Sequence, residues 1–330
     1  MKRSDRRKKK RKGLRNFFLV VGLIVFLGIG YVIYQYNSGL LLANAGKGKD
    51  DGTNFEEFEG ADSQFGEINV LLLGSDARGD EKDARSDSLM IAHYNQTTNE
   101  VKVVSIMRDT YVDIPNHGKQ KINNAFSIGG PELVRKTIKL NFDVDVQYFA
   151  IVDFSGFSKI VDVIAPDGIE VDIPHAMSHG IGMTLQPGKQ VLHGEQLLGY
   201  VRFRHDINSD FGRVERQQEA LSKLKEQAVS VHSLMNIPKL LGVVNPYVET
   251  NVDKRTLLTI GKGLLVGKSK GTESLRIPVE NSFENERVDV GAVLSIDFEK
   301  NKQALQEFLS SDGNSDVTKL DETGPGDNKK

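Results

Sequence analysis

Short apolar runs, rich in β-branched residues, recur through the middle of the chain and are separated by polar turns. Three of them, Ile68–Leu73, Leu89–Tyr94 and Val101–Ile106, have the length and composition of buried strands. The polar stretch Asn95–Glu100 between the second and the third predicts a hairpin turn. The same reasoning predicts further strands at Val144–Val152, Gly168–Ile173 and Ser274–Pro278.

Helical segments alternate with these strands. Gly130–Leu140 is predicted as a helix because a proline and an acid occupy its first turn. Ser155 is expected to cap a helix that ends at Ile164, and Leu185–His193 carries turn signals. The other predicted helices are Gly194–Val201, Val214–Val229, Pro238–Val244, Asp253–Leu265 and Phe298–Leu309. This alternation predicts an α/β fold of α-β-α type, in which helices flank a central mixed β-sheet that is antiparallel in part.

A long apolar stretch near the N-terminus differs from every other segment. Phe17–Tyr34 is uncharged, and about 20 such residues suffice to cross a bilayer as a helix. Ten Lys or Arg residues and one acid precede Asn16. By the positive-inside rule, this arm stays in the cytoplasm and the body lies outside, which predicts a single-pass type II membrane protein. A cleaved signal peptide is the competing interpretation, and a nucleic-acid-binding arm fits less well beside a membrane span.

These segments divide the chain into five parts. A basic arm (1–16) precedes the predicted membrane helix (17–36), and a polar tether without periodicity follows (37–65). One folded domain is expected at 66–310, and the polar tail 311–330 is predicted to be disordered. The chain has no cysteine, which excludes disulfides, thiolate metal sites and a thiol nucleophile.

Arginines gather in two loops that follow predicted strands and helices. Arginine binds phosphate oxygens through a planar fork of donors and keeps its charge. Ordinary surface ion pairs would account for any one of these arginines, but two clusters with interleaved aspartates favour a phosphate site. We expect the fold to bring the clusters together around a pyrophosphate. The residues are Arg78, Arg85 and Arg108 in the first cluster, and Arg202, Arg204, Arg213 and Arg216, with Gln217, in the second.

Three carboxylates lie among these arginines. Asp76 and Asp87 flank the first loop, and Asp210 lies in the second cluster. Mg²⁺, with Mn²⁺ as an alternative, is usually held by one or two carboxylates together with substrate phosphates. Pairing with the arginines is the alternative role for Asp76 and Asp87. His175 and His179 have helical spacing but lack the glutamate of a zinc protease motif, and glycines and prolines nearby favour a loop.

Several ordered motifs resemble the LytR–CpsA–Psr family of bacterial cell-envelope proteins. The resemblance covers residues 67–227, behind a similar cytoplasmic arm and membrane helix. The matching segments are Leu71–Arg78, Arg85–Met90, Val104–Pro115, Lys121–Phe126, Val152–Phe157 and Leu192–Gln218. Several motifs in the same order make a far more specific match than a lone short motif.

The resemblance implies a phosphotransferase. Such a protein moves an anionic glycopolymer, such as wall teichoic acid or capsule, from undecaprenyl pyrophosphate to peptidoglycan and also contacts membrane lipid. The resemblance implies that Asp76 and Asp87 bind the metal, and that Arg85, Arg108, Asp87 and Asp210 are catalytic. The pyrophosphate-binding residues implied are Arg78, Arg85, Arg108, Arg202, Arg204, Arg213 and Gln217.

Two other functions remain open at the level of sequence. A polyprenyl-pyrophosphate hydrolase would use nearly the same residues, with water in place of the sugar hydroxyl. A non-catalytic envelope regulator or lipid-binding module would bind the lipid without turnover. A nucleic-acid partner is not expected, because no helix-turn-helix pattern is present. The sequence leaves the glycopolymer and the general base unassigned.

Overall fold

The computed structural model describes residues 31, 34–35, 37–38, 56–62, 66–75, 86–206, 209–228, 242, 247–266 and 272–311. The chain forms two compact units. The first contains Gly74–Glu81 and Ile151–Thr250 together with Met1–Thr53. The second contains Asn54–Leu73, Lys82–Ala150 and Asn251–Lys330. Each unit is described by itself below.

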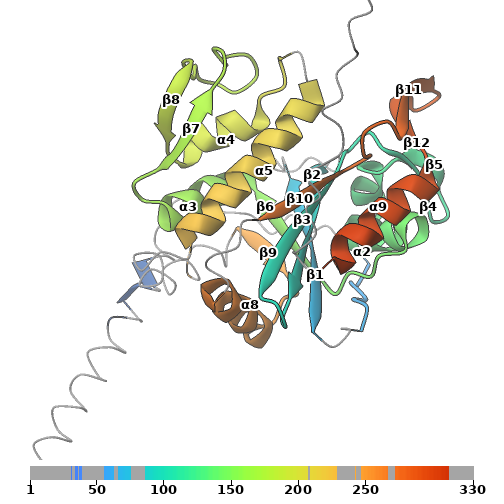
Figure 1. The fold of residues 1–330 in the computed structure, drawn as a ribbon, viewed down its shortest axis with the longest axis horizontal. Coiled ribbons are helices and arrows are strands. Elements are labelled where there is room, and N and C mark those ends of the chain that lie inside the picture. The colour runs from blue at the N-terminus through green and yellow to red at the C-terminus, as the bar shows by residue number, and fades with distance from the viewer. Residues whose placement is uncertain are drawn as a thin grey trace, which may run out of the picture. The chain divides into compact units, whose positions relative to one another are not determined.

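A six-stranded sheet is the largest element of the fold (Figure 1). Its strand order is β10-β3-β2-β1-β6-β9. β2 and β3 are antiparallel, with Leu89 opposite Ile106, whereas β10 runs parallel to β3, so the sheet is mixed. The strands are β1 (Glu67–Ser75), β2 (Ser86–Asn95), β3 (Glu100–Ile106), β6 (Tyr148–Asp153), β9 (Val248–Thr250) and β10 (Glu273–Ile277).

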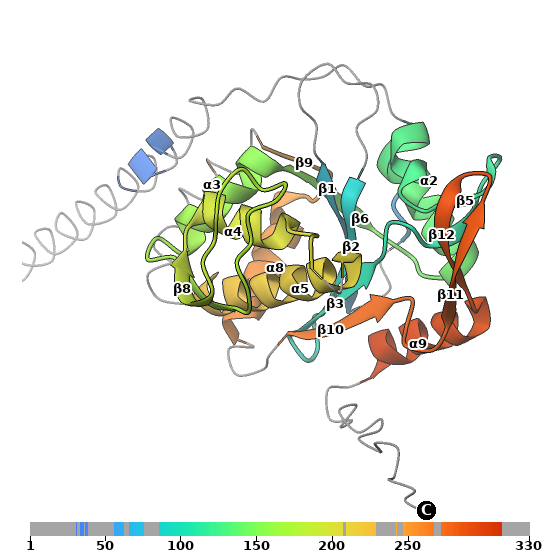
Figure 2. The ribbon, with the colours of Figure 1, turned by 90° about the horizontal axis from the view of Figure 1, so that it is seen from above.

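Helices of the second unit cover both faces of its strands. α8 (Lys254–Val266) contributes Ile260 to an apolar cluster with Ile68 and Tyr94. On the other side lie α2 (Asn124–Phe142) and α9 (Phe298–Ser310), which pack against each other (Figure 2). Because side chains alternate along β1, Ile68 and Val70 face one layer while Leu71 and Leu73 face the other. This alternation separates two apolar layers within one unit.

The helix α2 contains a break that its sequence explains. Gly129 and Gly130 have non-helical backbone angles, and φ of Gly130 is 62°. Glycine adopts this left-handed region without a steric penalty. Pro131 then begins the second helical segment, where a missing N–H costs no hydrogen bond.

Two antiparallel hairpins complete the second unit. β4 (Tyr111–Ile114) pairs with β5 (Gly118–Lys121), and β11 (Phe283–Val288) pairs with β12 (Gly291–Ile296). An isolated bridge joins Thr110 to Leu294 of β12. This bridge places β12 beside the segment that leaves β3.

The described part of the first unit includes three packed helices and a hairpin, in addition to β9. α3 (Phe154–Ile164) packs on α4 (Gly194–Arg202), and α4 packs on α5 (Ser209–Ala228). β7 (Ile169–Ile173) and β8 (Gly188–Leu192) form the hairpin. Val161, Leu192, Leu197 and Tyr200 belong to their shared buried core. This core fixes where α4 ends and α5 begins, and the second arginine cluster lies at that junction.

Residues that precede β1 belong to the second unit and pack against its other segments. The Glu59 N–H donates to Glu132 Oε2 at 3.0 Å, and the Phe58 ring lies 4.9 Å from the Phe149 ring. The Gly60 backbone is so close to Gln147 that an added Cβ would lie 2.2 Å from its carbonyl oxygen. The end of the predicted tether therefore contacts the folded unit in its described part, 56–62.

Most predicted elements are confirmed, with changes at their ends. The predicted strands at Ile68–Leu73, Val101–Ile106 and Ser274–Pro278 correspond to β1, β3 and β10, and the predicted hairpin at Asn95–Glu100 is present. The predicted cap Ser155 is wrong, because Asp153 accepts from the Gly156 N–H at 2.6 Å and the helix already starts at Phe154. The turn signals at Leu185–His193 concealed β8, and β4, β5, β9, β11 and β12 were not predicted.

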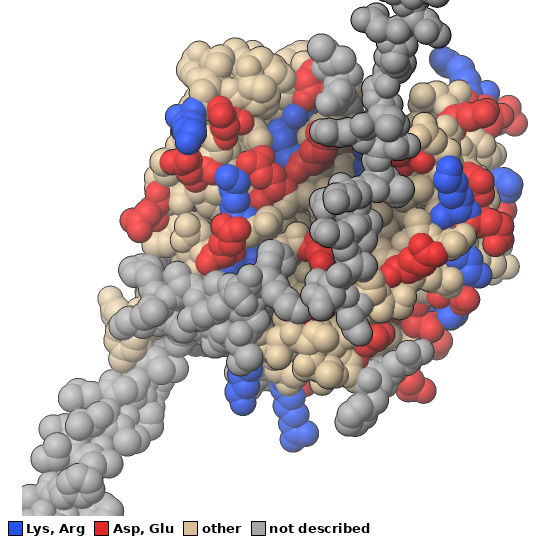
Figure 3. All heavy atoms as spheres, in the orientation of Figure 1, with Lys and Arg blue, Asp and Glu red and all other residues tan. Residues whose placement is uncertain are grey.

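The predicted membrane helix and part of the predicted C-terminal organisation lie outside the described residues. Of 17–36 only Tyr31, Tyr34 and Gln35 are described, and the predicted helix at Pro238–Val244 falls almost wholly in an undescribed stretch. Within the residues that the structure describes, no helix has the length and apolarity needed to cross a membrane. On the face seen in Figure 3, acidic and basic side chains are interspersed.

Candidate functional site

Arg108 lies between two carboxylates in the second unit. It follows β3 by two residues, and Asp87 is the second residue of the neighbouring strand β2. Arg108 Nη1 lies 3.1 Å from Asp87 Oδ1, and Arg108 Nε lies 3.4 Å from Asp109 Oδ2. The three side chains are 25% to 30% exposed, so the group is accessible from solvent. Two of the residues predicted from the sequence, Arg108 and Asp87, are therefore in direct contact.

Backbone hydrogen bonds hold the segment that carries Arg108. The Met107 N–H donates to the Ile277 carbonyl of β10 at 2.8 Å, and the Leu294 N–H of β12 donates to the Asp109 carbonyl at 2.9 Å. The Asn123 N–H donates to the Arg108 carbonyl at 3.3 Å. Three segments that are distant in sequence thus fix the main chain on both sides of the arginine.

Lys121 extends this cluster. Its Nζ lies 2.7 Å from Asp109 Oδ1, and its side chain is 22% exposed. The β4–β5 hairpin pairs Lys121 with Tyr111, which returns the lysine to the neighbourhood of Asp109. Asp109 and Lys121 were not predicted as site residues, although both lie inside the motifs that carry the family resemblance. The adjacent Arg-Asp pair and the lysine before the helix were the available signals.

A second cluster lies at the start of α5 in the first unit. Asp210 Oδ1 lies 3.6 Å from Arg204 Nε and 3.5 Å from Arg213 Nη2. Arg213 is 3% exposed and Asp210 16%, while Arg204 is 31% exposed. α5 begins at Ser209, five residues before its predicted start, which brings Asp210 into its first turn. The carboxylate therefore orients two of the predicted phosphate-binding arginines.

Arg202 and Gln217 lie beside this cluster. Arg202 is the last residue of α4 and stacks on Phe154, with 4.1 Å between its guanidinium carbon and the ring centroid. Arg202 is therefore helical, whereas Arg204 lies beyond the end of α4. Gln217 donates from Nε2 to the Val201 carbonyl at 3.4 Å, which ties α5 to the end of α4.

Arg216 has a structural role, although its position among the other arginines of the second cluster suggested phosphate binding. Its Nη1 lies 2.6 Å from Asp206 Oδ2, its Nε donates to the Tyr200 carbonyl at 3.2 Å, and its Nη2 donates to the Phe203 carbonyl. The residue is 8% exposed. A guanidinium that is buried and bonded on both edges is unsuited to bind a phosphate. Its sequence-based assignment to the phosphate cluster is wrong.

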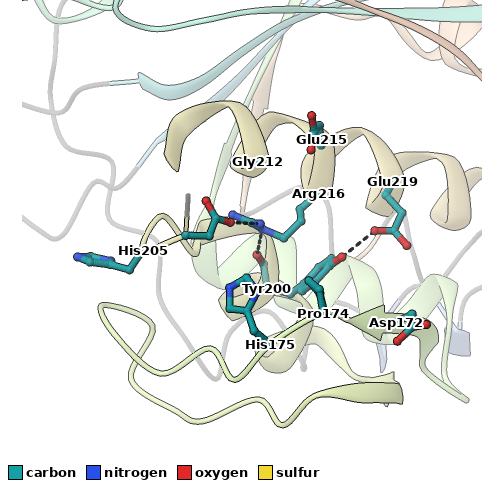
Figure 4. A pocket seen from close by; sticks show the side chains of 10 residues that line it. Asp172, Pro174, His175, Tyr200, His205, Gly212, Glu215, Arg216 and Glu219 are labelled. Atoms are coloured by element: carbon teal, nitrogen blue, oxygen red, sulfur yellow. Dashed lines mark hydrogen bonds and ion pairs between the residues drawn. The ribbon is translucent and has the colours of Figure 1, made fainter. Parts of the chain in front are cut away.

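A pocket of about 1310 Å³ lies beside Arg216 (Figure 4). Tyr200 donates its hydroxyl proton to Glu219 Oε2 at 2.7 Å, and burial together with this bond raises the pKa of Tyr200. His175 also lines the pocket, and His179 packs edge-on against His205 with 3.9 Å between ring centroids. The lining carboxylates are Asp172, Asp206, Glu215 and Glu219. This acidic lining disfavours phosphate, so the pocket differs in chemistry from the predicted pyrophosphate site.

Three predicted site residues, Asp76, Arg78 and Arg85, lie outside the described residues. The two described clusters belong to different compact units, and their joint binding of one pyrophosphate stays a prediction. No group of three or more His, Asp or Glu side chains suited to a metal ion occurs in the part of the chain that the structure describes.

Comparison with known proteins gives one consistent result. The model of the LytR_cpsA_psr family matches residues 32–307. The regulatory protein MsrR of Staphylococcus aureus (strain COL) is 39% identical over 284 residues, which are 86% of this chain and 85% of MsrR. The polyisoprenyl-teichoic acid–peptidoglycan teichoic acid transferase TagU of Bacillus cereus (strain AH820) is 33% identical over 268 residues, 79% of this chain and 86% of TagU.

Solved structures agree with these relatives. A structure of TagT bound to LIIa-WTA superposes with a TM-score of 0.61 and 25% identity, and the match covers 79% of this chain and 96% of TagT. The central mixed sheet flanked by helices is thus shared with this protein, and the predicted fold class is confirmed apart from the membrane helix.

Proposed function

The chain belongs to the LytR–CpsA–Psr family, and from that premise we propose that it transfers an anionic glycopolymer from undecaprenyl pyrophosphate to peptidoglycan. The name of TagU, a teichoic acid transferase, supports a transferase. The observation that carries the proposal to this chain is the contact of Arg108 with Asp87 at the ends of β3 and β2. A solvent-accessible arginine held by fixed strands is the kind of group that binds a pyrophosphate.

The proposed reaction breaks one phosphoanhydride bond and forms one phosphodiester. A hydroxyl oxygen of peptidoglycan attacks the phosphorus next to the glycopolymer, the hydroxyl loses its proton, and undecaprenyl phosphate leaves. The donor supplies the energy, so no nucleotide is required. Phosphoryl transfer depends mainly on positioning and on neutralising charge. Arg108 in the second unit, and Arg202, Arg204 and Arg213 in the first, are the described residues that we assign to phosphate binding.

We assign a divalent metal, Mg²⁺ or Mn²⁺, to Asp87 and Asp76. The donor chemistry fits at Asp87, because a carboxylate oxygen is a ligand that Mg²⁺ prefers and one or two carboxylates suffice when phosphates complete the shell. Asp87 is 30% exposed and already lies among charged groups. When bound, the ion would add positive charge beside the pyrophosphate. The arginines assigned above would orient the pyrophosphate-linked donor beside the ion.

The proposed location follows from the same assignment. A lipid-linked donor resides in a membrane, and we place the folded units outside the cell, tethered by the apolar segment 17–36 as a type II anchor. Membrane lipid and peptidoglycan are then the two surfaces that the protein contacts. Adding protease to intact cells and to spheroplasts tests this orientation. The folded units should be cleaved in spheroplasts whose membrane is intact, and their protection there would contradict it.

The decisive experiment is a transfer assay with the full chain in detergent. It supplies a synthetic polyprenyl-pyrophosphate glycan, Mg²⁺ and a peptidoglycan oligomer, and it identifies products by mass spectrometry. Arg108→Ala is expected to lower the rate by roughly 10²- to 10³-fold, because it removes a contact to the developing charge. Arg287→Ala is the matched control, since Arg287 is an exposed arginine of the same unit on β11.

The products separate the three functions. Phosphate-linked glycan on the acceptor, lost in Arg108→Ala and kept in Arg287→Ala, supports the transferase. Free glycan phosphate and lipid phosphate without acceptor product would identify a hydrolase. Binding of the lipid without any turnover would favour a non-catalytic regulator or lipid-binding module; MsrR is named a regulatory protein.

A further inference from the structure

Arg108, Asp109 and Lys121 form a continuous chain of ion pairs. Lys121 Nζ contacts Asp109 Oδ1 at 2.7 Å, and Asp109 Oδ2 contacts Arg108 Nε at 3.4 Å. Both oxygens of Asp109 are therefore engaged by cations, each on its own side. Neither Asp109 nor Lys121 has a role in the function proposed above.

We propose that Lys121 is a positioning residue, which orients Arg108 for the pyrophosphate by holding Asp109 in place. This inference rests on the proposed function, because it names how one residue of that site is aimed. Asp109 holds the Nε edge of the guanidinium, so the rotation of the side chain is fixed. Asp87 contacts Nη1 on the other edge at 3.1 Å. If a metal ion or a phosphate drew Asp87 away, Asp109 would still hold the arginine.

The surrounding backbone makes this arrangement rigid. The Asp109 carbonyl accepts from the Leu294 N–H at 2.9 Å, and the Ile122 N–H, next to Lys121, donates to the Thr110 carbonyl at 2.9 Å. Val112 and Ile114 of β4 and Ile122 are at most 2% exposed. Three side chains on a buried framework can hold a guanidinium within the tolerance that phosphoryl transfer requires.

Asp109 itself is better suited to hold than to accept a proton. A general base needs an oxygen within hydrogen-bond reach of the proton that it removes. Both oxygens of Asp109 already contact cationic side chains. The carboxylate therefore acts as a bridge between two cations. Its removal should change the orientation of the Arg108 guanidinium in the same way as removal of Lys121.

The test is a double-mutant cycle in the full chain. Lys121→Met and Asp109→Asn should each lower kcat/KM for transfer by roughly 10- to 100-fold, because a misplacement of about 1 Å has effects of that order. The kcat/KM of the double variant should be no more than about 3-fold below that of the less active single variant, since both substitutions break the same chain of ion pairs. Lys121→Arg should retain at least about a third of the activity, because it restores the contact.

Lys119→Met is the matched control. Lys119 lies two residues earlier on β5, is exposed, and is placed over the Phe298 ring at 5.8 Å. It removes the same charge from the same strand, and transfer should stay within about 2-fold of wild type. If the two single losses multiply in the double variant, Lys121 acts independently of Asp109, and the proposal is overturned.

Equilibrium binding keeps this test separate from that of the proposed function. The same variants are titrated with farnesyl pyrophosphate, which requires no turnover. Lys121→Met and Asp109→Asn should weaken binding to a similar extent and without additivity. If wild type binds this probe but transfers nothing, the proposed function fails while the coupling is still measured. Unchanged binding and unchanged transfer in Lys121→Met would reject the positioning role.

Discussion

Arg216 and Asp206 form a buried ion pair, with 2.6 Å between Nη1 and Oδ2 and with each side chain 9% exposed. The pair connects α5 to the loop that follows α4, and Arg216 also donates to the carbonyls of Tyr200 in α4 and of Phe203 just after it. Arg213, one helical turn earlier, instead contacts Asp210 together with Arg204. Two arginines of one motif therefore serve different ends: one stabilises the first unit and the other belongs to the candidate site.

Replacing Arg216 should unfold the first unit more easily. Arg216→Met leaves Asp206 buried without its partner, which typically costs about 3 to 5 kcal/mol. Chemical denaturation followed by circular dichroism measures the change. Lys189→Gln removes one partner of an exposed pair with Glu170 and should change stability by less than about 1 kcal/mol. Equal losses in the two variants would contradict the structural role of Arg216.

Asp210→Asn should slow transfer by orienting Arg204 and Arg213 less well. A loss of about 10- to 100-fold in kcat is expected, because the amide keeps the size of the side chain but loses its charge. The pH dependence of kcat distinguishes this role from general base catalysis. We expect the acidic limb of the profile to persist in Asp210→Asn; its disappearance would identify Asp210 as the base instead.

His93 should make the second unit less stable in mild acid. His93 is 2% exposed, and its Nδ1 lies 2.8 Å from Asn69 Oδ1. Burial, with a smaller contribution from Lys102 and against an opposing one from Glu67, lowers the pKa of His93 from 6.5. The unfolded chain then binds the proton more readily than the native one, so stability is complete above pH 6.5 and falls as the pH drops below it.

Urea unfolding of wild type and His93→Gln between about pH 5 and 8 measures this effect. The unfolding free energy is plotted against pH, and the difference in slope between the two proteins is the contribution of His93. His117→Gln is the control, because His117 is exposed. A wild type whose unfolding free energy is flat across this range would contradict the prediction.

Glu132 should hold the residues that precede β1. Its side chain is 1% exposed and contacts Arg135 at 2.6 Å, and it accepts the Glu59 N–H. Burial alone would raise the pKa of Glu132, but the bonds from Arg135 and Glu59 and the charges of Arg135 and Lys136 outweigh it and lower that pKa below 4.5. Its contribution to stability is therefore present above pH 4.5 and is lost as the pH falls below that value.

Glu132→Gln should reduce stability by about 1 to 3 kcal/mol at neutral pH, as expected for hydrogen bonds to a charged group. Amide hydrogen exchange at Glu59 should accelerate in this variant, because its acceptor loses its charge. Glu284→Gln, at an exposed position on β11, serves as the control. Unchanged exchange at Glu59 would show that the contact contributes nothing.

Removal of divalent metal should abolish transfer. A chelator in excess is expected to stop product formation, and Mg²⁺ or Mn²⁺ should restore it. In Asp87→Asn the metal concentration for half-maximal rate should rise by at least about 10-fold, because one of its carboxylate ligands is lost. Transfer that continues at full rate in the chelator would remove the metal from the proposal.

Local sequence patterns predicted many of the described helices and strands. The strands β1, β2 and β3, the hairpin between the last two, and the helices α3, α4, α5, α8 and α9 follow from the period of apolar residues and from turn chemistry, which act over a few neighbours. Most of the strands that were missed are short or exposed, as β5 and β11 are, so alternation leaves too weak a signal to detect. β12 is an exception, because it has six residues and its Val293, Leu294 and Ile296 are buried.

The candidate site could be predicted by residue type but not by role. The sequence by itself determined that arginines and aspartates gather in two segments, because the motifs are contiguous. Only the tertiary structure decided that Arg216 is buried against Asp206, that Asp210 contacts Arg204 and Arg213, and that Lys121 reaches Asp109. These partners are set by the pairing of β4 with β5 and by the packing of α5 on α4. Such long-range contacts depend on which surfaces meet, and the period of a local pattern carries no information about that.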